Sequence, residues 1–103
     1  MADGRKMVTK IQDRYGNLIE LTDERWQHII TYHPELEGCR DGVLETIRKG
    51  ARRQDVVEPE KYKYVRKFAD LPLDYTHLVA VVKMVRNNFV LTAYGIEKKG
   101  RRR

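Results

Sequence analysis

The sequence predicts one α+β domain in which two helices from the N-terminal half pack on an antiparallel sheet of four or more strands, with an N-terminal hairpin. Three observations predict this class. Apolar residues recur at helical spacing between residues 22 and 50, segments rich in β-branched and aromatic residues follow residue 55, and two short strand-like segments precede the first helix. A length of 103 residues is the usual size of a single domain.

The first element is a hairpin. Residues 8–13 and 18–21 have strand composition, and Tyr15, Gly16 and Asn17 lie between them. Glycine and asparagine accept the positive φ angles that a tight turn requires. The sequence therefore predicts two antiparallel strands joined by a short turn.

Two helices follow the hairpin. Thr22 is placed to cap the first helix, and Pro34 ends it because the proline ring pushes the preceding residue out of the α region. The second helix begins at Cys39 or Asp41 and ends at Gly50, after two basic residues in its last turn. Both helices are expected to be amphipathic.

The C-terminal half is predicted to form three or four strands. Residues 56–57, 62–69, 77–85 and 89–96 are rich in β-branched and aromatic side chains. Residues 86–88 form a short loop, so the last two strands are antiparallel neighbours. The segment 77–85 is apolar at successive positions, which is typical of a central strand covered at least partly on both sides.

Alternation divides these strands into faces. In the last strand we expect Phe89, Leu91 and Ala93 to face the helices, and we expect the opposite face to carry Val90, Thr92, Tyr94 and Ile96. In the predicted strand at residues 62–69 one face is shared by Tyr62, Tyr64, Arg66 and Phe68. Whether the Arg66 face and the Tyr94 face coincide is left open by the sequence. If they do, they form a groove lined by tyrosine, threonine and arginine.

The charge of the chain favours a polyanionic partner. The formal net charge is +6, and residues 98–103 carry five of these charges. A single cysteine, Cys39, excludes an internal disulfide, and no apolar run is long enough to span a membrane. We therefore expect a cytoplasmic protein with a domain at residues 7–97 and flexible tails at residues 1–6 and 98–103.

Two histidines on the first helix are candidates for proton transfer. His28 and His33 lie five positions apart, or about 140° around the helix axis, so they do not chelate one metal ion. His33 is expected to face the sheet, and His28 lies nearly opposite. RNA cleavage without metal needs a base for the 2′-OH, a cation beside the phosphate and an acid for the leaving oxygen. Histidine, arginine, tyrosine and threonine supply these groups, and no cofactor or metal is expected.

Four stretches resemble the small phage and bacterial members of the barnase, EndoU, colicin and RelE-like (BECR) nuclease superfamily: LTDERWQHIITYHPEL, YKYVRKFADLPL, HLVAVVKMV and FVLTAYGIEK. The resemblance implies a helical layer on an antiparallel sheet. It also implies a catalytic group made of a helical histidine (His28 or His33), Arg66, and a hydroxyl from Thr92 or Tyr94. The expected substrate contacts are Tyr64, Lys63, Lys67 and Lys83.

Two functions remain open at this point. The first is a toxin-like, metal-independent endoribonuclease that leaves a 2′,3′-cyclic phosphate. The alternative is a non-catalytic, basic RNA-binding or regulatory module on the same fold. A zinc protein is disfavoured because one cysteine and three scattered histidines lack ligand spacing. The expected partners are RNA and, by analogy with toxins, an acidic antitoxin protein, with the chain a monomer or a small homo-oligomer and no membrane contact.

Overall fold

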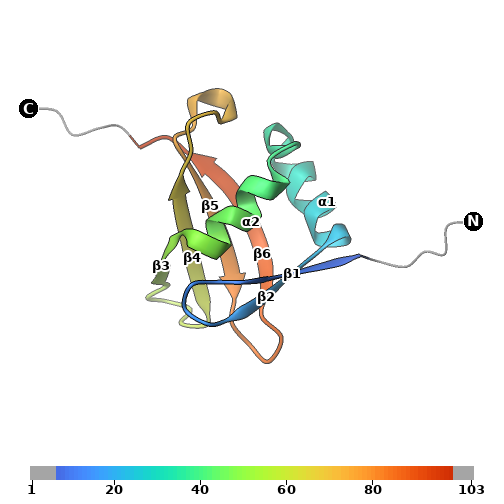
Figure 1. The fold of residues 1–103 in the computed structure, drawn as a ribbon, viewed down its shortest axis with the longest axis vertical. Helices are drawn as coiled ribbons and strands as arrows, with labels where there is room; N and C mark the ends of the chain where they lie inside the picture. Colours follow the sequence, from blue (N-terminus) through green and yellow to red (C-terminus); the bar gives the residue numbers. More distant parts are fainter. Residues whose placement is uncertain (1–6, 99–103) are drawn as a thin grey trace, which may run out of the picture.

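The computed structural model describes residues 7–98, so the predicted tails at residues 1–6 and 98–103 lie outside this range except for Lys98, whose backbone N–H donates to the Thr76 hydroxyl at 2.8 Å. It confirms the α+β class with two helices, a mostly antiparallel sheet and an N-terminal hairpin (Figure 1). The helices are α1 (Asp23–Tyr32) and α2 (Arg40–Lys49). The strands are β1 (Val8–Gln12), β2 (Leu18–Thr22), β3 (Ala51–Gln54), β4 (Lys61–Lys67), β5 (His77–Lys83) and β6 (Phe89–Ile96). None of the helices described is long and apolar enough to cross a membrane.

One sheet contains all six strands, in the order β1-β2-β6-β5-β4-β3. Every neighbouring pair is antiparallel except β2 and β6, which are parallel and meet only at Glu20 and Phe89. Beyond Phe89, β6 has no pairing with β2, and α1 packs against both strands. The Arg25 Nη1 group of α1 donates to the Leu91 carbonyl of β6 at 3.5 Å. This helix therefore borders the sheet at β6.

The helix boundaries follow from local chemistry. The Thr22 hydroxyl accepts a hydrogen bond from the Arg25 backbone N–H at 3.0 Å, which satisfies one of the unpaired donors at the start of α1. Trp26 and Ile29 are buried, and Pro34 begins a separate short 3₁₀ turn. These features confirm the predicted first helix. The second helix is confirmed in the same way, since Gly50 caps its C-terminus.

The prediction of a strand at residues 56–57 is wrong. Val56 and Val57 are 93% and 80% exposed in the loop between β3 and β4. The strand lies earlier instead, at Ala51–Gln54, where it pairs antiparallel with β4 at the edge of the sheet. Its sequence, ARRQ, has no apolar alternation because an edge strand of this kind buries no side chain.

The predicted alternation in β6 is partly wrong because this strand contains a bulge. Val81 pairs with Thr92, but Val82 pairs with Val90, so Leu91 is an extra residue on β6. The bulge turns Val90 to the helix-covered side, where it is fully buried, and places Phe89 opposite Lys83 on the other side. Ala93 lies on the face covered by α2, in agreement with the prediction, and Thr92, Tyr94 and Ile96 lie on the opposite face.

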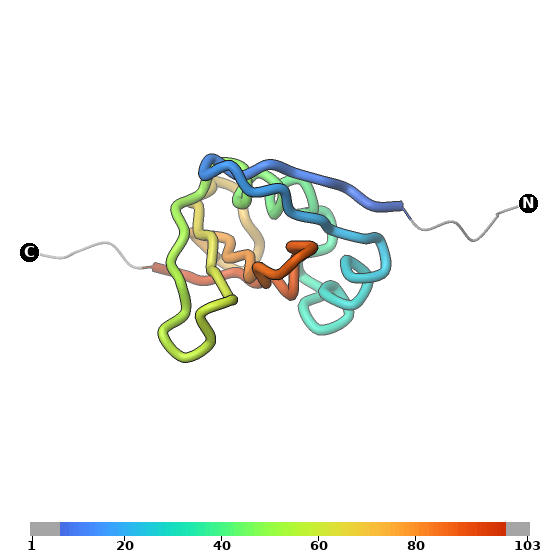
Figure 2. The backbone as a smooth tube through the Cα atoms, turned by 90° about the horizontal axis from the view of Figure 1, so that it is seen from below, coloured from blue at the N-terminus to red at the C-terminus, as the bar shows by residue number. Residues whose placement is uncertain are grey.

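The two faces of the sheet differ in what covers them. Helix α2 packs on β4 and β5, over a core that includes Tyr64, Leu78, Ala80 and Val82. We call the opposite face of the sheet the open face. The β3–β4 loop and α1 project on the side of the open face, whereas α2 lies on the other side (Figure 2). The pairing assigns to the open face Ala51, Arg53, Lys61, Lys63, Val65, Lys67, His77, Val79, Val81, Lys83, Phe89, Thr92, Tyr94 and Ile96.

Candidate nucleic-acid interface

The open face is basic. Its side chains include four lysines and one arginine, and none of the strand positions that β3–β6 give to this face is Asp or Glu. One row across the four strands reads Arg53, Lys63, Val81, Thr92. Neighbouring strands lie about 4.8 Å apart, so the backbones at Lys63 and Thr92 are roughly 10 Å apart. The register therefore brings three predicted substrate contacts, Lys63, Lys67 and Lys83, onto the same face as Thr92 and Tyr94.

A hollow of about 380 Å³ opens on this side of the molecule. Its apolar lining comes from Ala51, Val65 and Ile96, and the cations around it are Arg53, Lys63 and Lys98; Arg52 also borders it, with its side chain on the opposite face of β3. An apolar floor with cations around it suits a ligand that presents both rings and phosphates.

His77 is a histidine of the open face that the sequence analysis did not select. Its Nδ1 atom lies 2.7 Å from the Thr76 hydroxyl oxygen. Burial lowers the pKa of His77, and the nearby charges of Lys98 and Lys67 lower it further. Burial, together with these two cations, therefore favours the neutral form of the His77 imidazole.

His33 lies at the exit of α1, beside the open face. Its ring centroid is 6.3 Å from that of Tyr94, and its Nδ1 atom is 3.9 Å from a Glu35 carboxylate oxygen. That carboxylate accepts a hydrogen bond from the Tyr75 hydroxyl at 2.8 Å. The pKa of Glu35 is lowered by its own backbone N–H, by the Tyr75 hydroxyl and by His33, so Glu35 is ionised at neutral pH. The Glu35 carboxylate therefore lies within ion-pair distance of the His33 imidazole.

His28 lies away from the Tyr94 ring. It is exposed on α1 and makes an edge-to-face contact with Tyr32, with ring centroids 4.9 Å apart. A separate hollow of about 230 Å³ is lined by Thr22, Glu24, Arg25 and His28. Arg25 and His28 are three positions apart, so they lie on one strip of the helix. The structure thus separates the two predicted histidines: His33 contacts the open-face tyrosine, and His28 lines a hollow with Arg25.

The predicted grouping of Arg66 with Tyr94 is wrong. Arg66 pairs with Leu78, which pairs with Gly95, whereas Tyr94 belongs to the row of Val65 and Val79. Because side chains alternate along a strand, Arg66 and Tyr94 point to opposite faces of the sheet. The Arg66 guanidinium lies 5.1 Å from the Phe68 ring. Arg66 therefore does not share a groove with His33 and Tyr94.

The expectation that Tyr64 contacts substrate is also contradicted. Tyr64 is fully buried under α2, and its hydroxyl donates to the Asp13 carboxylate. Burial raises the pKa of Tyr64, and the hydrogen bond to Asp13 raises it further. Tyr64 is a protonated core residue, and its ring is not available for stacking against a base.

Sequence reasoning missed Glu35, Tyr75 and Arg25 as neighbours of the candidate histidines. Glu35 had a local signal, since it follows His33 by two positions in the HPE run. Tyr75 had none, because its contact with Glu35 spans 40 residues. Arg25 lies in the LTDERWQHIITYHPEL stretch that carries the resemblance, but its hydrogen bond to the β6 backbone spans 66 residues and has no local signal.

Gly95→Ala tests whether close packing against Gly95 holds Tyr75 in place beside Glu35. A Cβ atom at Gly95 would lie 2.1 Å from the Tyr75 ring, so the substitution displaces Tyr75 from its place beside Glu35. We expect the free energy of unfolding, measured by urea denaturation, to fall by about 1–3 kcal/mol. In a Tyr75→Ala background the same change costs less, because the collision is gone. Fully additive effects of the two substitutions contradict this account.

Comparison of the chain with family models, with curated proteins and with solved structures found no match. The fold and the open face define the protein as an α+β domain. It has a basic sheet surface and a histidine–carboxylate pair at the border of that surface.

Proposed function

We propose that the protein is a metal-independent endoribonuclease that binds single-stranded RNA on the open face and cleaves it beside α1. One observation carries the proposal: His33, next to the ionised Glu35, contacts Tyr94 at the border of a sheet face on which strands β3–β6 carry cations and no carboxylates. The resemblance to the BECR nucleases supports the same reading. An acidic partner protein that covers this face belongs to the proposal as well.

Binding is assigned to the basic residues of the open face. Lysine and arginine near phosphates release condensed counterions, which gives affinity that falls with salt. Phe89 and Tyr94 are the aromatic side chains on the open face of β6, and bases of single-stranded RNA stack on such rings. Arg53, Lys63 and Lys83 are the phosphate contacts that we assign.

Cleavage is assigned to the rim at α1. The 2′-OH attacks phosphorus, a P–O2′ bond forms and the P–O5′ bond breaks, which leaves a 2′,3′-cyclic phosphate and a 5′-OH. His33 takes the 2′-OH proton, and Tyr94 gives a proton to the leaving 5′ oxygen. The cation that replaces the expected Arg66 is assigned to the lysines of the open face, because Arg66 points to the opposite face and Arg25 lines the separate hollow with His28. Glu35 positions His33.

A second function is favoured by one finding. With Arg66 on the covered face, the predicted guanidinium clamp is absent from the groove, and the basic open face needs no clamp to bind RNA. The alternative is therefore a non-catalytic RNA-binding module that uses the same face.

The test is incubation of the pure protein with total RNA in EDTA, with analysis of product ends. We expect fragments that end in 2′,3′-cyclic phosphate. Salt-dependent binding without fragments supports the module instead, and binding that is absent at low salt removes both functions.

Lys63→Gln tests RNA binding to the open face separately from cleavage. Loss of one phosphate contact should reduce the slope of log affinity against log salt by about 1. Lys49→Gln, on exposed α2, is the matched control because Lys49 pairs with Glu45 on the other side of the sheet. Equal slopes for Lys63→Gln and the unaltered protein would remove Lys63 from the interface.

A further inference from the structure

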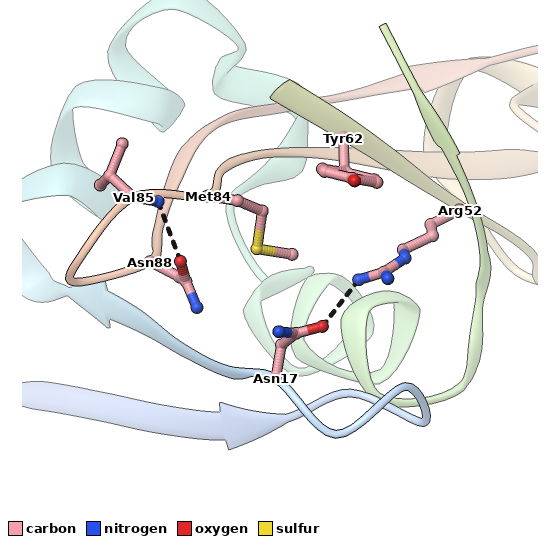
Figure 3. A pocket seen from close by; sticks show the side chains of 6 residues that line it. All are labelled: Asn17, Arg52, Tyr62, Met84, Val85 and Asn88. Atoms are coloured by element: carbon pink, nitrogen blue, oxygen red, sulfur yellow. Dashed lines mark hydrogen bonds between the residues drawn. The ribbon is translucent and has the colours of Figure 1, made fainter. Parts of the chain in front are cut away.

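A third hollow lies on the covered side of the sheet, where the hairpin turn and the β5–β6 turn approach β3 and β4. Its volume is about 350 Å³, within the range of small-molecule sites. Figure 3 shows the side chains that line it: Asn17, Arg52, Tyr62, Met84, Val85 and Asn88. None of these side chains belongs to the open face.

Arg52 is held in a fixed position in this hollow. Its Nη1 atom donates to Asn17 Oδ1 at 2.8 Å, to Asp13 Oδ2 at 3.2 Å and to the Tyr64 hydroxyl at 3.3 Å. The guanidinium also lies 4.2 Å from the Tyr15 ring centroid and 4.6 Å from that of Tyr62. A side chain so constrained loses little entropy when it binds a ligand.

The remaining hydrogen-bonding capacity defines the ligand. Within residues 7–98 every hydrogen bond of this guanidinium starts at Nη1, so the edge formed by Nε and Nη2 has no protein acceptor. That edge offers two parallel N–H donors. The Asp13 carboxylate already balances the charge of Arg52, so a free anion gains little here. The ligand that fits is neutral and planar, with two adjacent acceptors.

The apolar lining points to a ring. Tyr62 contributes an aromatic wall, and Met84 and Val85 contribute apolar surface. Among the purine bases guanine presents two adjacent acceptors, O6 and N7, which arginine binds in a bidentate manner. We propose that this hollow binds a guanine base through Arg52 and Tyr62. Guanine binding here is independent of cleavage at the open face.

The test is a calorimetric titration of the full chain with guanosine, adenosine, cytidine and inorganic phosphate. We expect guanosine to bind about tenfold or more tightly than adenosine, which lacks the paired acceptors. Tyr62→Leu should weaken guanosine binding by about tenfold through loss of the ring. Arg52→Lys retains the charge beside Asp13 but loses the paired donors, so it should abolish the preference for guanosine.

A neighbour in β4 supplies the control. Lys63→Gln alters the open face one residue away and should leave guanosine affinity unchanged, whereas Tyr62→Leu should leave the salt dependence of RNA binding unchanged. Absence of guanosine binding, equal affinity for the three nucleosides, or binding of phosphate alone overturns the inference. So does unchanged guanosine affinity in Tyr62→Leu, whose circular dichroism spectrum establishes whether the variant is folded.

Discussion

We expect Arg52→Met to lower the free energy of unfolding by about 3–5 kcal/mol, the usual cost of removing one partner from a buried ion pair. The Asp13 side chain is fully buried, and the Arg52 side chain is 21% exposed. Without Arg52 the Asp13 carboxylate keeps the Tyr64 hydroxyl and two backbone N–H groups as partners but has no cation. The loss of the stacked guanidinium between Tyr15 and Tyr62 adds to the effect.

Chemical denaturation followed by circular dichroism measures this change. Arg53→Met is the matched control, because Arg53 is the next residue of β3, is exposed and faces the other way. We expect the control to change stability by no more than about 0.5 kcal/mol. Similar losses in the two variants would show that the Asp13–Arg52 pair does not anchor the hairpin to β3.

The second large effect is expected for His33→Ala. Removal of a positioned proton-transfer group lowers a rate by about 10²- to 10⁴-fold, and we expect this loss in RNA cleavage measured in EDTA. His33 is half-buried at the end of α1, so the variant should remain folded. Glu35→Gln should cause a smaller loss, because Glu35 acts through His33.

His28→Ala is the control for this assignment. His28 is exposed and contacts Tyr32 rather than Tyr94, so its removal should leave the cleavage rate nearly unchanged. If His28→Ala abolished cleavage and His33→Ala did not, the catalytic histidine would be the one beside Arg25.

The elements with local signals were predictable from the sequence. Thr22, Pro34 and Gly50 mark helix ends by chemistry that acts within a few residues, and Gly16 and Asn17 mark the hairpin turn. Strand β3 was not predictable, since its stability comes from pairing with β4 and not from its own pattern. The loop at Val56 and Val57 had strand composition without a pairing partner.

The site was predictable only in part, for a related reason. Alternation shows which residues of one strand share a face, but which faces of two strands coincide depends on their register. Alternation therefore predicted correctly that Thr92 and Tyr94 share a face. The prediction that Arg66 joins them was wrong, because the register puts Arg66 on the opposite face. The bulge at Leu91 is equally a property of strand pairing. The contact between Asp13 and Tyr64 spans 51 residues and has no local signature.

The central claim is that RNA binds to the open face, and valine methyl groups report on it directly. Val65, Val79 and Val81 belong to the open face, where Val79 and Val81 are 3% and 6% exposed, and Val82 and Val90 belong to the face covered by α2. In a spectrum of valine-methyl-labelled protein titrated with a non-cleavable RNA oligonucleotide, we expect the first three to shift and the last two to stay in place. Shifts confined to Val82 and Val90 would contradict the account.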